Sequence, residues 1–162
     1  MHRVNAPIDW ARDAYGNGQG IVLQIENNAA NADLISRLIA RRANLTLHTA
    51  VDGLLGYVLA QTLQPDIILL DMVMPVVTGY ETLLLLRENA LTKHIPVLIL
   101  TSSAARGQQQ KCLDAGAFGY LTKPYRIDDL MALIDTALHA VNLGKQQAGT
   151  SMQRSADDRI RV

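Results

Sequence analysis

The stretch Asp66-Ile67-Ile68-Leu69-Leu70-Asp71-Met72-Val73-Met74-Pro75 is the most informative part of this sequence. Its four consecutive apolar residues, 67–70, are typical of a strand that is buried on both faces of a parallel sheet. Asp71 follows the apolar run directly. The stretch therefore predicts a central strand with a carboxylate at its carboxyl end.

Similar short runs occur on both sides of this stretch, at residues 21–25, 45–49, 97–100 and 119–122. Apolar residues recur at three- and four-residue spacing after most of these runs, which predicts helices there. The segment at 108–113 is short and polar, and its helix is predicted only from the repeated pattern of strand and helix. The run at 45–49 alternates in polarity, as an edge strand does. Strict alternation of strands and helices predicts an α/β fold, a doubly wound five-stranded parallel sheet with helices on both faces.

Length and composition limit what the chain can do. The 162 residues provide for one domain of ordinary size, and 49% of them are hydrophobic, enough for a core. The 15 basic and 15 acidic residues balance, which argues against a dominant nucleic-acid surface. A single cysteine excludes an internal disulfide, and no apolar run approaches the length of a membrane span. We expect a cytoplasmic protein that binds neither a membrane nor, directly, nucleic acid.

The two ends differ in composition from the middle of the chain. Residues 1–19 are polar and glycine-rich but contain Trp10, which either tethers this segment to the domain or is exposed. Residues 144–162 lack an apolar period and have a disorder-like composition. We therefore predict an N-terminal tail over 1–19, one domain over 20–143 and a disordered C-terminal tail over 144–162.

Polar side chains follow four of the predicted strands, namely Glu26, Asp71, Thr101 and Lys123. The carboxyl ends of parallel strands meet at one edge of the sheet, where ligands of doubly wound folds bind. Taken singly, each residue has an ordinary structural explanation as a cap or a surface group. As a set they suit phosphoryl transfer, because a carboxylate can accept the group while an ammonium and a hydroxyl bind its oxygens.

The sequence resembles the receiver domain of two-component response regulators, from residue 20 to about residue 141. The resemblance is carried by 25–28 (Ile-Glu-Asn-Asn), the stretch 66–75, Gly79, Leu100-Thr101 and 116–124 (Gly-Ala-Phe-Gly-Tyr-Leu-Thr-Lys-Pro). It implies a flavodoxin-like (βα)5 fold with strand order 2-1-3-4-5. It also implies that Asp71 accepts phosphate from a phosphohistidine on a sensor histidine kinase or phosphotransfer protein.

The resemblance assigns roles to further residues. Lys123 would bind the phosphoryl group and form a cis peptide with Pro124, while Thr101 and Tyr120 would form the switch. Mg²⁺ would be held by Glu26, Asn27, Asp71 and the Val73 backbone carbonyl. The fourth helix, fifth strand and fifth helix would form the responsive face, through which a homodimer could assemble. Beyond self-phosphorylation from a donor and auto-dephosphorylation, no enzymatic activity is implied.

Asn27 departs from the family pattern, which has two adjacent acids at this place. An amide oxygen contributes no negative charge, so we expect weakened Mg²⁺ binding. This leaves two hypotheses open: a phosphorylatable response regulator, and a degenerate receiver that only binds other proteins. A dinucleotide-binding protein is disfavoured because Gly16, Gly18 and Gly20 precede the first strand. A flavodoxin is disfavoured because the turn after the first strand is not a hydroxyl-rich phosphate loop. An aspartyl phosphatase is disfavoured because it would have a carboxylate at position 73, where this chain has valine.

Overall fold

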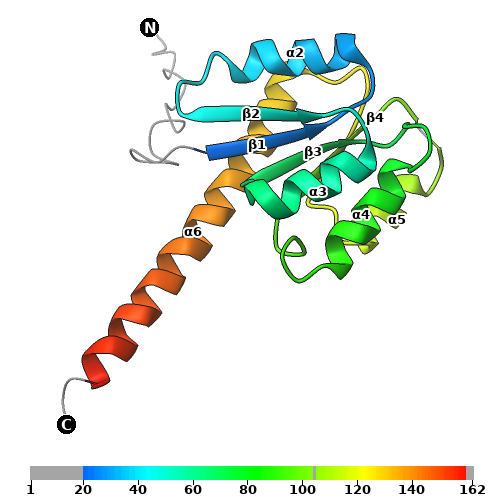
Figure 1. The fold of residues 1–162 in the computed structure, drawn as a ribbon. Helices are drawn as coiled ribbons and strands as arrows, with labels where there is room; N and C mark the ends of the chain where they lie inside the picture. Colours follow the sequence, from blue (N-terminus) through cyan, green and yellow to red (C-terminus); the bar gives the residue numbers. More distant parts are fainter. Residues whose placement is uncertain (1–19, 104, 160–162) are drawn as a thin grey trace, which may run out of the picture.

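The computed structural model describes residues 20–103 and 105–159, with side chains described as far as residue 148. Within these residues, five strands and five helices alternate (Figure 1). They are β1 (Gly20–Ile25), α2 (Ala29–Ile39), β2 (Leu45–Ala50), α3 (Gly53–Leu63), β3 (Ile67–Asp71), α4 (Gly79–Glu88), β4 (Val97–Thr101), α5 (Gln108–Asp114), β5 (Gly119–Thr122) and α6 (Ile127–Arg159).

All five strands are parallel, in the order β2-β1-β3-β4-β5. This confirms the predicted fold and places the fully buried β3 and β4 inside the sheet. The pairing of Asp71 with Leu100 and of Thr101 with Thr122 extends both strands by one residue beyond their predicted ends. Asp71 and Thr101 are therefore the last residues of strands and are fixed by the sheet ladder.

Two hydrophobic cores lie on the two faces of the sheet. One core packs α3, α4 and α5 against alternate strand residues such as Leu23 and Ile25, and it includes the buried Cys112. The other packs α2 and α6 against the intervening residues, such as Val22 and Leu69. Because successive side chains of a strand point to opposite faces, a continuously apolar strand such as β3 serves both cores.

The predicted disorder after residue 143 is wrong for residues 144–159, which continue α6 beyond the body of the protein (Figure 1). Extending a helix avoids the cost of nucleating a new one, and residues 145–148 are favourable helix formers. Lys145 also anchors this part of α6, because its Nζ lies 2.6 Å from Asp66 Oδ1. The domain limits of 20 and 143 stay predictions, and the predicted tail over 1–19 with Trp10 lies outside the described residues, as do residues 160–162.

Candidate functional site

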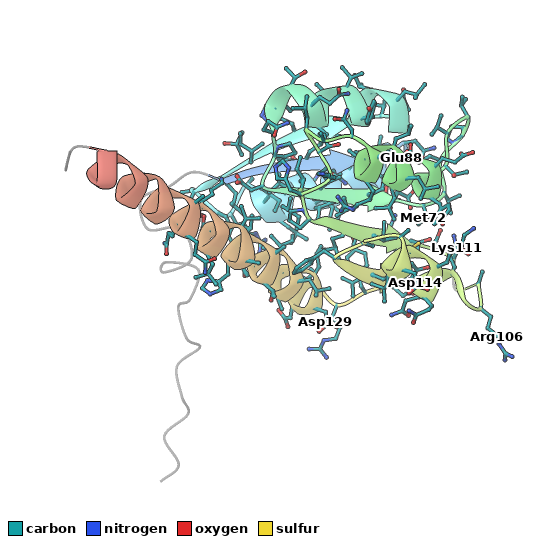
Figure 2. All side chains as sticks on the ribbon, turned by 90° about the horizontal axis from the view of Figure 1, so that it is seen from below. Met72, Glu88, Arg106, Lys111, Asp114 and Asp129 are labelled. Carbon is teal, nitrogen blue, oxygen red and sulfur yellow. The ribbon has the colours of Figure 1, made fainter. Side chains whose placement is uncertain are left out.

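The strands bring the predicted polar residues to one edge of the sheet. Glu26 follows β1, Asp71 and Thr101 end β3 and β4, and Lys123 follows β5. Met72, the residue after Asp71, lies at this edge beside the start of α5 (Figure 2). The residues come from four strands that are far apart in sequence, so only the parallel sheet can assemble them.

Three charged groups form the centre of the site. Lys123 Nζ lies 2.9 Å from Glu26 Oε2 and 3.5 Å from Asp71 Oδ1. The side chains of Glu26 and Asp71 are only 4% and 7% exposed, and that of Lys123 is 17% exposed. Two carboxylates thus share one ammonium group in a poorly solvated place, which leaves one negative charge for a cation to balance.

The environment of Asp71 raises the pKa of its carboxyl group. Burial is the main cause, and the nearby charge of Glu26 adds to it. The charge of Lys123, with hydrogen bonds from Lys123 and the Val73 backbone, lowers the pKa but does not cancel the effect of burial. Ionising Asp71 in the folded protein therefore costs more free energy than ionising an aspartate in water.

Glu26 is held from both sides. Its Oε2 accepts from Lys123, and its Oε1 accepts from the backbone N–H of Asn28 at 2.9 Å. The Asn28 side chain in turn caps α2 by accepting from the backbone N–H groups of Ala30 and Asn31. Asn28 thus links the start of α2 to Glu26. Sequence reasoning did not single it out as a site residue, although asparagine is a favourable N-cap residue, and this preference could have indicated its role.

Asn27 and Val73 lie at the solvent side of this centre. Asn27 is exposed, and Val73 is 55% exposed as a whole residue. The turn after Val73 leads to Gly79, whose backbone N–H donates to Met72 O at 3.1 Å. A Cβ atom on Gly79 would lie 2.2 Å from Asp71 O, so this close approach of α4 to β3 requires glycine.

Thr101 and Tyr120 meet at the loop after β4. Thr101 is fully buried, and its Oγ1 accepts from the backbone N–H of Ser103 at 3.0 Å. The Tyr120 hydroxyl donates to Ser103 O at 3.2 Å, and its ring packs on the α3–α4–α5 core. Thr101 O also accepts from the Lys123 backbone N–H at 2.7 Å. One loop residue, Ser103, therefore joins both predicted switch residues, a contact that no local sequence pattern reveals.

The donor set fits a divalent cation that retains water. Among residues 20–103 and 105–159, no group of three or more His, Cys, Asp or Glu side chains could enclose a metal ion. Mg²⁺ instead usually takes one or two carboxylates together with water and phosphate oxygens. Glu26 and Asp71 provide the two carboxylates. The peptide bond between Lys123 and Pro124 is cis, as the resemblance implied.

Comparison with known proteins identifies the family: residues 22–135 match the response regulator receiver domain, and the chain belongs to this family. It is 31% identical to the polar-differentiation response regulator DivK of Brucella anthropi, over 72% of this chain and 94% of DivK. It is 35% identical to the transcriptional regulator RpaA of Synechocystis, over 78% of this chain and 52% of RpaA. The chain thus spans about half the length of RpaA.

The solved structures agree. The receiver domain of sensor histidine kinase PA1611 from Pseudomonas aeruginosa is 26% identical and superposes with a TM-score of 0.67, covering 75% of this chain and 98% of that one. That structure has a magnesium ion coordinated in its active-site cleft. In this protein, no helix in the described part of the chain has the length and apolar character of a membrane span.

Proposed function

We propose that this protein is a phosphorylatable response regulator in which Asp71 accepts a phosphoryl group from a phosphohistidine donor. The donor would belong to a sensor histidine kinase or a phosphotransfer protein. The observation that carries the proposal is the buried Asp71 carboxylate, 3.5 Å from the ammonium of Lys123, which also binds Glu26. This arrangement combines a nucleophile with an ammonium group that can bind the negatively charged oxygens of an incoming phosphoryl group.

In the transfer, Asp71 Oδ forms a bond to phosphorus while the bond between phosphorus and the donor imidazole breaks. The bonding electron pair leaves with the imidazole nitrogen, which then takes up a proton. Lys123 stabilises the phosphoryl oxygens through its charge, and the Thr101 hydroxyl supplies a hydrogen bond. Hydrolysis of the resulting acyl phosphate by water resets the protein, so it acts as a phosphoacceptor and not as an enzyme with a separate substrate.

The ligands proposed for Mg²⁺ are Glu26, Asn27, Asp71 and the Val73 backbone carbonyl. When bound, the ion would neutralise negative charge on the phosphoryl oxygens. Glu26 and Asp71 supply the two carboxylates that such a site requires, whereas Asn27 adds an oxygen without charge. The proposed site therefore carries one negative charge fewer than a site with an acid at position 27.

We further propose that Thr101 and Tyr120 relay phosphorylation to the face formed by α5, β5 and α6. Their shared contact with Ser103 supports this relay. On this side of the molecule, Arg106 projects from the loop before α5 and Asp129 from the start of α6 (Figure 2). This face would bind a partner, a second copy of the chain, or the recipient of the phosphoryl group, in the cytoplasm and without direct contact to nucleic acid.

Incubation with acetyl phosphate and Mg²⁺ tests the proposal, with intact mass and Phos-tag mobility as the measurements. We expect wild-type protein to gain one phosphoryl group and Asp71→Asn to gain none. Asp66→Asn is a matched control, because Asp66 is equally buried but lies at the opposite end of β3. It should be phosphorylated like the wild type.

Asn27 also favours a second function, a degenerate receiver that binds its partner without phosphorylation. The observation behind it is that, among the residues that the structure describes, no third carboxylate joins Glu26 and Asp71 at the proposed metal site. Folded wild-type protein that gains no phosphoryl group at any Mg²⁺ concentration, from acetyl phosphate or from a phosphorylated histidine phosphotransfer protein, would favour this second function over the first.

A further inference from the structure

A cavity of about 1040 Å³ lies at the amino-terminal edge of the sheet, at the end opposite Asp71. Its walls are the segments that lead into β3, β4 and β5, together with the side of α6 that runs past them. In Figure 1, α6 leaves the body beside the amino ends of β1 and β3. We name this space the amino-edge cavity; it takes no part in the proposed phosphoryl transfer.

Much of the amino-edge cavity is lined by apolar groups. They include Pro65, Ile95, Pro96, Phe118, Ala140 and Val141. Phe118 is the single phenylalanine of the chain, and 38% of it is exposed. A Cβ atom added at Gly144, which also lines the cavity, would meet no atom within 4 Å. The small residues of α6 thus leave room for an apolar group in the cavity that Phe118 also lines.

Positive charge predominates around this apolar lining. Among the described residues, Arg87, Lys93 and Lys145 line the cavity against one carboxylate, that of Asp66. Asp66 is already engaged, because Lys145 Nζ and the Ile21 backbone N–H each donate to it. The Arg87 guanidinium donates to the backbone carbonyls of residues 93, 95 and 116, at 2.8–3.0 Å, which are dipoles and not anions. A ligand with an apolar group and neighbouring acids would suit this cavity.

The chain enters its first strand at the edge of the same cavity. Ile21 and Asp66 are joined by two hydrogen bonds of 2.8 Å, from Ile21 N to Asp66 Oδ2 and from Asp66 N to Ile21 O. Gly20, the first described residue, therefore precedes a pair of bonds to Asp66, which lines the cavity. Trp10 precedes Gly20 by ten residues, and such a length of chain reaches up to about 35 Å when extended.

We propose that the chain's own segment 8–15 (Ile-Asp-Trp-Ala-Arg-Asp-Ala-Tyr) docks in the amino-edge cavity, with the Trp10 indole against Phe118 and Val141. The segment supplies an aromatic anchor flanked by two acids, Asp9 and Asp13, against one base. Its charge is thus complementary to that of Lys93 and Arg87. Because a short tether gives an effective concentration in the millimolar range, this segment outcompetes the same segment of a second copy.

Trp10 is the only tryptophan in the chain, so fluorescence excited at the red edge, where the five tyrosines do not absorb, reports on it alone. We expect an emission maximum shifted to shorter wavelength, and a several-fold lower acrylamide quenching constant, relative to the same protein in urea. Native protein whose emission and quenching equal those in urea would overturn the proposal. Both quantities should be independent of protein concentration, and a shift that disappears on dilution would also overturn it, because the occupant would then be a second copy.

A pair of variants on α6 locates the binding site. Ala140→Phe fills the amino-edge cavity and should return emission and quenching to the values in urea. Ala132→Phe adds the same ring at another exposed position of α6 that does not line the cavity, and it should leave both unchanged. If circular dichroism shows that both variants are folded and Ala140→Phe keeps the wild-type signal, Trp10 binds elsewhere and the proposal is wrong.

The charges of the segment provide an independent test. Replacing Asp9 and Asp13 together by asparagine should weaken docking and increase quenching, while added salt should do the same to the wild type. Quenching that responds to neither change would contradict the contribution assigned to Lys93 and Arg87.

Discussion

At the scale of single residues, the buried charge of Asp71 has a measurable cost. Its pKa is raised, chiefly by burial, so the folded protein binds a proton at this group more tightly than the unfolded chain does. Below the unfolded pKa the group is protonated in both the folded and the unfolded state, so its burial there carries no charge penalty. Stability is lost as the pH rises through the folded pKa, because the carboxylate must then be charged in a poorly solvated site.

We therefore predict that Asp71→Asn, which cannot ionise, has a higher Tm than the wild type at pH 7. The difference should shrink as the pH falls through the raised pKa of the folded protein, and it should vanish below the unfolded pKa of 3.8, where both side chains are neutral. Thermal unfolding followed by circular dichroism at a series of pH values measures it. Asp66→Asn is the control for loss of a buried aspartate at the other end of β3. A gap between Asp71→Asn and wild type that grows as the pH falls would contradict a raised pKa for Asp71.

Asn27 provides the second residue-scale prediction. In Asn27→Asp, an additional carboxylate beside Glu26 and Asp71 should increase Mg²⁺ affinity by about tenfold, or ~1.4 kcal/mol. The measurement is the rise in Tm across a Mg²⁺ titration, since a ligand that binds the folded state stabilises it. Without Mg²⁺ the variant should be less stable, because three carboxylates then share Lys123.

Asn28→Asp is the matched control for this experiment. It adds the same charge one residue later, but the side chain at position 28 caps α2, and aspartate caps as well as asparagine does. Its Mg²⁺ affinity should stay close to that of the wild type. Equal gains from both substitutions would indicate a general charge effect, and no gain from Asn27→Asp would remove Asn27 from the proposed ligands.

The sequence could predict which residues share the site, but not how they contact one another. The placement of Glu26, Asp71, Thr101 and Lys123 at one edge of the sheet could be predicted because each follows or ends a strand, and parallel strands align their carboxyl ends. That Lys123 lies nearer to Glu26 than to Asp71 depends on the loops after β1 and β5. The contact of Tyr120 with Ser103 likewise depends on long-range packing, which no local pattern encodes.

At the scale of elements, the first turn of α4 is the structure that fixes the backbone behind Asp71. Thr78 and Glu81 form a capping box: the Thr78 hydroxyl accepts from the Glu81 backbone N–H, and the Glu81 carboxylate accepts from the Thr78 backbone N–H. These bonds hold the helix start where Gly79 approaches Asp71 O. A change at this cap should therefore affect stability and the site together.

We predict that Thr78→Ala destabilises the protein by about 1 kcal/mol, the usual cost of a lost N-cap. For a chain of this size the loss corresponds to a fall in Tm of roughly 2–4 °C. Thr78→Ser, which keeps the hydroxyl, should lie within about 0.5 kcal/mol of the wild type. Urea unfolding gives both values. A Thr78→Ser protein as unstable as Thr78→Ala would show that the methyl group matters and the cap does not.

The elements themselves were largely predictable, and the exceptions have a physical reason. Apolar runs located all five strands, and hydrophobic period located α2, α3, α4 and the buried part of α6, because burial on the sheet determines where apolar residues fall. The short α5 is largely polar, and only the repeated pattern of strand and helix predicted it. Hydrophobic period failed for residues 144–159, where the helix continues without a core to bury. The contact of Lys145 with Asp66 joins residues far apart in the sequence, so a composition rule applied to the tail could not anticipate it.

At the scale of the whole molecule, α2 and α6 cover the same face of the sheet but come from opposite ends of the domain. A pair of hydrogen-bonded charges connects the two regions: the guanidinium of Arg42, just after α2, binds both carboxylate oxygens of Asp135 on α6. The Asp135 side chain is 3% exposed and that of Arg42 is 20% exposed. The amino-terminal and carboxyl-terminal parts of the domain are thus joined by a largely buried ion pair.

Such a pair is costly to break by removing one partner, because the remaining charge stays buried without compensation. We predict that Asp135→Asn lowers the free energy of unfolding by about 3 kcal/mol, the lower end of the range for buried pairs because Arg42 keeps some contact with water.

The matched control is Asp128→Asn on the same helix. Asp128 pairs with Arg126 at 3.6 Å, but both side chains are more than three-quarters exposed, so the change should stay within about 0.5 kcal/mol. Urea unfolding followed by circular dichroism compares the two, and equal effects would mean that Arg42 and Asp135 contribute no more than a surface pair. Replacing Arg42 by Met and Asp135 by Leu together should recover much of the loss, because apolar groups of similar size leave no unpaired charge behind.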